Sequence, residues 1–63
     1  GDLEKRHIEA TYGAEYENAL TQAIEWRMNG SSVATIRDML KSSYSTGLTE
    51  EGRKQIIAAL ESY

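Results

Sequence analysis

The chain has 63 residues, no cysteine and a formal net charge of −3, so it can form one domain with a thin hydrophobic core. The missing cysteines exclude disulfides and thiolate metal sites and favour a cytoplasmic or other reducing compartment. No apolar run reaches the roughly 18 residues of a membrane span, and the charged stretch at residues 2–6 is unlike a signal peptide, so we expect no membrane partner.

The first segment predicts a long helix over residues 3–29. Its apolar residues recur every three or four positions, which is the spacing of one helical face; they are Ile8, Tyr12, Tyr16, Leu20, Ala23, Ile24 and Met28. Gly13 lies inside this segment and costs about 1 kcal/mol relative to alanine. The helix therefore either kinks at Gly13 or begins only near Ala14, and we expect it to end at Asn29-Gly30.

Two shorter helices are predicted next, over residues 32–43 and 49–62. Ser31 or Ser32 is expected to cap the first of them, whose apolar positions are Val33, Ile36, Met39 and Leu40. The polar run 42–47 then interrupts the helical pattern. Thr49 is the expected cap of the last helix, and the two glutamates after it lie where the helix dipole favours acids. The apolar stripe of this helix consists of Ile56, Ile57, Leu60 and Tyr63.

These patterns predict an all-α fold, a small three-helix bundle in which residues 1–63 form a single domain. Each helix is apolar on one side, so the stripes must be buried against one another or against another chain. Trp26 is the largest side chain and is expected where the first helix meets the other two. Residues 2–15 extend beyond what two short helices can cover. Either this end is a docking or dimerisation surface, or a bent helix folds back and covers it.

Residues that could support catalysis are scarce. His7 is the only histidine and cysteine is absent. The chain therefore lacks most of the residues that form the common pairs of a catalytic nucleophile and its general base. Glu4 and His7 have the i, i+3 spacing of carboxylate-bridged metal sites, but such sites need a second pair and two further carboxylates. We therefore expect no enzymatic activity, no cofactor, no metal site and no small-molecule substrate.

The leading hypothesis is a small non-enzymatic interaction or regulatory module that binds a protein partner or dimerises through its N-terminal helix. The predicted partner-binding surface consists of Ile8, Tyr12, Tyr16 and Trp26. Tyrosine and tryptophan are frequent in binding hot spots. Residues 1–30 carry six acids and three bases, and these acidic flanks would favour a basic partner.

The alternative hypothesis is a helix-turn-helix DNA-binding domain over residues 16–63. Arg37 and Lys41 share a face at i, i+4. Arg53 and Lys54 lie in the first turns of the third helix, where a recognition helix carries the side chains that contact the bases. Asp38 separates the first pair, and two glutamates precede the second. Acids at these places would repel phosphate, and the negative net charge disfavours nucleic-acid binding. Ordinary pairing of surface charges is the competing interpretation of the four bases.

The same stretch resembles the helical part of the linker-histone globular domain, a winged helix that binds DNA. The resemblance covers residues 23–60 and rests on Ala23-Ile24, Asn29-Gly30-Ser31-Ser32-Val33, Ile36-Arg37, Tyr44 and the stretch from Arg53-Lys54 through Ala59-Leu60. That family is strongly basic, whereas this sequence is acidic. The resemblance therefore implies a similar helical architecture and carries no function over to this chain.

Overall fold

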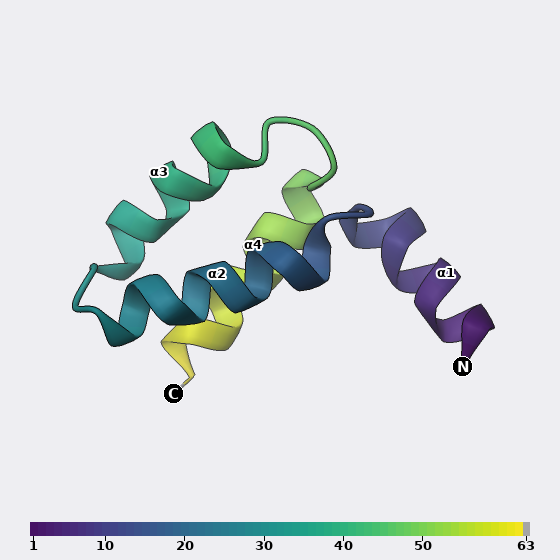
Figure 1. Ribbon diagram of the computed structural model, residues 1–63, viewed down its shortest axis with the longest axis horizontal. Coiled ribbons are helices and arrows are strands. Elements are labelled where there is room, and N and C mark those ends of the chain that lie inside the picture. The colour runs from purple at the N-terminus through teal and green to yellow at the C-terminus, as the bar shows by residue number, and fades with distance from the viewer. Residues whose placement is uncertain (63) are drawn as a thin grey trace.

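The computed structural model describes residues 1–62 and folds them into four helices (Figure 1). The helices are α1 (Asp2–Tyr12), α2 (Tyr16–Met28), α3 (Val33–Ser43) and α4 (Glu50–Glu61). Residues 1–62 contain no strand, so the predicted all-α fold is confirmed. Tyr63, which the sequence pattern assigned to the last apolar stripe, lies outside the described residues.

The prediction of three helices with one long N-terminal helix is wrong, because the segment 3–29 breaks at Gly13. This glycine has φ 108° and ψ 151°, a conformation that a residue with a Cβ rarely adopts. Its amide donates to the Glu9 carbonyl at 2.9 Å and ends α1. Figure 1 shows that α1 leaves this corner at a steep angle to α2 and does not continue its axis. The predicted helices at 32–43 and 49–62 correspond to α3 and α4.

Two side chains cap helices, as the sequence predicts. The Ser32 hydroxyl accepts a hydrogen bond from the Thr35 amide at 3.1 Å, at the start of α3. The Thr49 hydroxyl accepts one from the Gly52 amide at 3.0 Å, at the start of α4. Each cap satisfies an amide that has no partner within its helix, so both helices begin where their caps place them.

The core lies between α2, α3 and α4, and its fully buried side chains come from all three. Two alanines of α2 pack against larger aliphatic residues of α3 and α4; the buried set is Ala19, Ala23, Ile36, Leu40, Ile56 and Leu60. The alanines leave room for the neighbouring helices to approach α2 closely. The shortest extent of the chain is 15 Å, which corresponds to two layers of helices packed at about 8–10 Å.

The α1–α2 corner is tied to the loop before α4 by three hydrogen bonds. The Thr49 amide donates to the Tyr12 carbonyl at 2.9 Å, and the Thr49 hydroxyl donates to the Thr11 carbonyl at 2.8 Å. The Glu15 amide donates to the Gly47 carbonyl at 2.8 Å. Thr49 therefore caps α4 and anchors the end of α1 at the same time.

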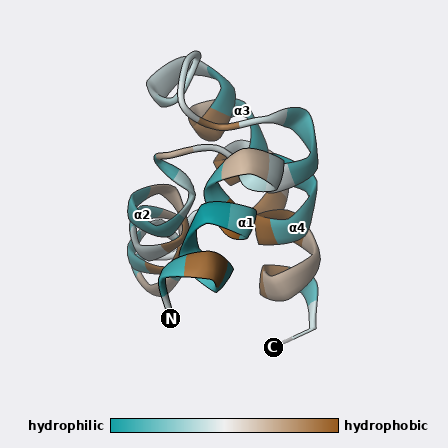
Figure 2. Cartoon of the chain, turned by 90° about the vertical axis from the view of Figure 1, so that its right-hand side faces the viewer, coloured by the Kyte–Doolittle hydropathy of each residue, from teal (hydrophilic) through white to brown (hydrophobic). Residues whose placement is uncertain are grey.

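Close packing of α1 on α4 depends on Gly52, in the first turn of α4. A Cβ at this position would overlap the Tyr12 carbonyl oxygen. Among the described helices, α1 contacts α4 and α2 but not α3, and none of its residues is fully buried. Figure 2 shows α1 in front of the bundle and mostly hydrophilic, with apolar segments of α3 and α4 behind it. Of the two alternatives for the N-terminal segment, the structure has the helix that folds back.

Candidate interaction surface

Three of the four predicted partner-binding residues meet where α1 turns into α2. Ile8, Tyr12 and Tyr16 are all half-buried there, and the two tyrosine rings have centroids 4.8 Å apart with planes tilted by 34°. Packing of α1 against the chain's own α4 therefore covers part of the surface that the sequence left without a neighbour. These three side chains are therefore only partly available to a partner.

Trp26, the fourth predicted residue, lies apart from the other three. It is ten residues beyond Tyr16 on α2, which is about 15 Å along the helix. Its side chain is half-buried against the core formed by α2, α3 and α4. The four residues do not form one continuous surface.

Tyr16 also has a perturbed acidity. Burial raises the pKa of Tyr16 above the ordinary value of 10.0, and the neighbouring Tyr12 phenol raises it further. Both effects disfavour the phenolate. Tyr16 therefore remains neutral at physiological pH and acts as an apolar ring that fills the corner.

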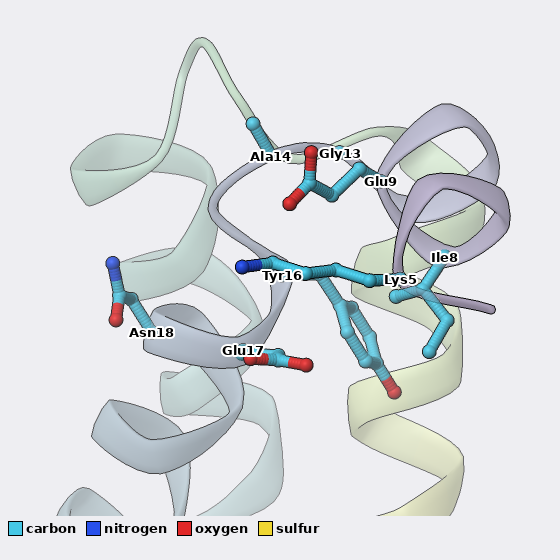
Figure 3. Close-up of a pocket in the computed structure, with 8 residues that line it drawn as sticks. All are labelled: Lys5, Ile8, Glu9, Gly13, Ala14, Tyr16, Glu17 and Asn18. Atoms are coloured by element: carbon cyan, nitrogen blue, oxygen red, sulfur yellow. The ribbon is translucent and has the colours of Figure 1, made fainter. Parts of the chain in front are cut away.

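A polar cleft lies between α1 and α2, beside Tyr16. In Figure 3 the Lys5 side chain crosses this cleft over the Tyr16 ring, with the Glu9 carboxylate on one side of its ammonium and Glu17 on the other. Two carboxylates and one ammonium leave the cleft with one net negative charge. The local field at this end of α2 therefore favours an incoming cation.

Three large apolar side chains are exposed among the described residues: Leu3 stands alone near the start of α1 at 79%, and the other two lie together on the outward side of α2. Met28 is 81% exposed and Ile24 is 38% exposed. Together with Arg27 and with Leu60 of α4 they line an open groove between the ends of the two helices. Their spacing in the sequence predicts that Ile24 and Met28 belong to the buried stripe. Their positions around the helix could have shown that they stay exposed, because Ile24 and Met28 project away from the side of α2 on which Ala19 and Ala23 face the core.

The four candidate DNA-binding residues are spread over two helices and mixed with acids. Arg37 and Lys41 are exposed on α3, and Lys41 and Arg53 line one depression together with Glu50. The Arg53 guanidinium lies 3.7 Å from the Glu50 carboxylate, and the Lys54 ammonium lies 4.0 Å from the same carboxylate. The ammonium is also 4.0 Å from the Glu51 carboxylate. Acids thus offset the two bases of α4.

Glu4 and His7, the pair with metal-site spacing, are both exposed on α1. Within residues 1–62 there is no group of three or more histidine, cysteine, aspartate or glutamate side chains placed to hold a metal ion. Over the same residues, no helix has both the length and the apolar character needed to cross a membrane.

Comparisons with protein-family models, with curated proteins and with solved structures found no match to this chain. The resemblance to the helical part of the linker-histone globular domain therefore has no matching family or structure to support it. Among the described residues, Ile24 and Met28 on α2 are the exposed large apolar side chains that lie together.

Proposed function

We propose that this chain is a non-enzymatic protein–protein interaction module of a regulatory kind, and that its working surface is the outward face of α2. The observation that carries the proposal is the exposure of Met28 and Ile24, 81% and 38% respectively, beside a groove that ends at Leu60. A chain of 63 residues has few large apolar side chains to spare. Leaving two of them next to each other in water favours a binding role.

The other two depressions support this choice of surface. The cleft beside Tyr16 is lined mainly by charged and polar groups of α1 and α2, and the one beside Tyr44 is lined by Lys41, Arg53 and Glu50. The cleft beside Tyr16 lacks an apolar floor, and the depression beside Tyr44 has Leu48 in its lining but is surrounded by three charged side chains. The groove at Met28 is apolar and open, as a docking surface for a protein segment would be.

DNA binding is the less favoured function, because acids accompany the candidate bases. Glu50 and Glu51 lie within 4.0 Å of the Arg53 or Lys54 side chains. A phosphate approaching α4 would meet both carboxylates as well as both cations. Counterion release, which supplies most non-specific affinity for DNA, needs unopposed cations.

The proposal is tested by placing a photo-cross-linking amino acid at position 28 in cells that make the protein. The matched control carries the same group at position 38, because Asp38 is exposed on α3, away from the groove. We expect cross-linked protein adducts from position 28 that are absent or weak from position 38. Equal yields from the two positions, or no adduct at position 28, would contradict an interaction role for this face.

A further inference from the structure

The outward face of α2 has the residue spacing of a coiled-coil seam. Glu17, Leu20, Ile24 and Arg27 are separated by three, four and three residues, which is the alternation of heptad positions a and d. Glu17, Ile24 and Arg27 are exposed and Leu20 is half-buried. The fully buried side chains of α2, Ala19 and Ala23, directly precede Leu20 and Ile24 in the sequence, so each points about 100° away from its seam neighbour. Leu20 packs partly against the chain's own core, while the exposed Glu17, Ile24 and Arg27 leave the rest of the seam open to another helix.

The charges at the two ends of this seam are opposite. Glu17 lies at the N-terminal end, next to Glu9 in the cleft that holds one net negative charge, and Arg27 lies at the C-terminal end. The two apolar residues, Leu20 and Ile24, lie between them. Such a pattern is complementary to itself when a second identical helix runs in the opposite direction.

The geometry points to a second copy of this chain as the occupant, and we propose that α2 pairs antiparallel with α2 of another copy. In one alignment of the two helices, Glu17 faces Arg27 of the second copy and Leu20 faces its Ile24. A two-fold axis repeats both contacts, because such an interface uses the same surface on both copies. One register thus satisfies the apolar pairs and the charge pairs together. The inference rests on the proposed interaction function and names its partner.

Met28 lies just beyond the seam and is 81% exposed. Met28 follows Arg27 at the end of α2, so antiparallel pairing brings it over the Glu17 end of the other α2, beside the polar cleft. The flexible methionine side chain adapts readily to such irregular contacts. The thin core of a 63-residue chain gives a further reason for pairing, since small domains often gain stability from a second subunit.

The dimer is expected to be weak and dependent on concentration. A standard interface buries about 800 Å² on each partner, which would be nearly a fifth of this chain's 4389 Å² surface. α2 has 13 residues and is about 20 Å long. One helix face of this length buries less area than a standard interface, so the equilibrium should shift between monomer and dimer over an accessible concentration range.

The test is the solution mass measured by sedimentation equilibrium for the wild type, for Glu17→Arg, for Arg27→Glu and for the double variant. Each single reversal should raise the dimer Kd by about tenfold or more, because every dimer contains the pair twice. The double reversal restores opposite charges across the axis and should recover the wild-type Kd. Circular dichroism of each variant checks that the exposed substitutions leave the helices intact.

Matched controls change the same charges away from the seam. Glu25→Arg lies on α2 outside the a and d positions, and Arg37→Glu lies on α3; both residues are exposed. These controls should leave the Kd unchanged. A wild type that stays monomeric to millimolar concentration, seam and control variants that behave alike, or a double reversal that fails to recover the dimer would each overturn the inference. If the chain is monomeric while position 28 cross-links a different protein, the proposed function stands and the second copy is the wrong partner.

Discussion

Replacing Gly52 with alanine should destabilise the fold, although helix propensity alone predicts the opposite. Gly52 lies in the first turn of α4, and alanine is favoured over glycine in helices by about 1 kcal/mol. In the structure, however, the added Cβ would overlap the Tyr12 carbonyl oxygen and lie 2.9 Å from Leu48 Cδ1. Because a backbone carbonyl is involved, α1 must move away from α4 to make room.

The expected loss combines two costs and one gain. Overpacking costs about 1–3 kcal/mol, and displacing α1 weakens the hydrogen bond from the Thr49 amide to the Tyr12 carbonyl, which contributes about 1 kcal/mol. Subtracting the propensity gain of about 1 kcal/mol leaves a net destabilisation of about 1–3 kcal/mol. For a domain of this size, 1 kcal/mol corresponds to about 4–8 °C in Tm.

The assay is thermal unfolding followed by circular dichroism at the helical band. Gln55→Ala serves as control, because Gln55 is exposed on the same helix and reports propensity without the steric effect. We expect a Tm for Gly52→Ala that is lower than that of the wild type by several degrees or more, with the control close to the wild type. A Tm at or above that of the wild type would refute the close approach of α1 and α4.

Three further predictions concern the corner, the core and pH. Thr49→Ala should cost more than Ser32→Ala in urea unfolding. Both hydrogen bonds of the Ser32 hydroxyl go to Thr35 within the first turn of α3, where a cap contributes about 1 kcal/mol, whereas the Thr49 hydroxyl also donates to the Thr11 carbonyl of another helix. Equal losses would argue against the tie to α1. Leu40→Ala, at a fully buried position, should cost about 2–5 kcal/mol, and a loss below this range would place Leu40 outside the core. Since burial raises the pKa of Tyr16 above 10.0, the folded state holds that proton more tightly than the unfolded state. The resulting stability is complete below pH 10 and is lost as pH rises through the raised pKa. The urea midpoint should therefore fall less steeply above pH 10 in Tyr16→Phe than in the wild type, and parallel curves would contradict the shift.

Local signals in the sequence were sufficient for the all-α fold and for the two caps. Ser32 and Thr49 each precede a helix whose start depends on one side-chain acceptor, so near neighbours in the sequence determine it. Gly13 was recognised as a weak point of the first helix. That it ends α1 altogether depends on contacts with the loop around Gly47, which is more than thirty residues away in the sequence.

The role of Gly52 and the exposure of Met28 could not be read from the sequence for a related reason. Helix propensity marks Gly52 as a weakness, and only the packing of α1 against α4 reveals that a Cβ would not fit there. Periodicity groups Met28 with the apolar stripe of a single long helix. Once the helix breaks at Gly13, the direction in which α2 faces the core is set by Ala19 and Ala23, and Met28 remains outside.

If the outward face of α2 is the working surface and pairs with α2 of a second copy, its exposed methionine should report the pairing. Met28 and Met39 are the chain's two methionines; the first is 81% exposed on α2, and the second is half-buried on α3 against the core. The most direct test is a series of methionine methyl NMR spectra recorded from micromolar to millimolar concentration. The Met28 methyl resonance should shift with concentration while that of Met39 stays in place. A stationary Met28 resonance, or a shift confined to Met39, would contradict the pairing.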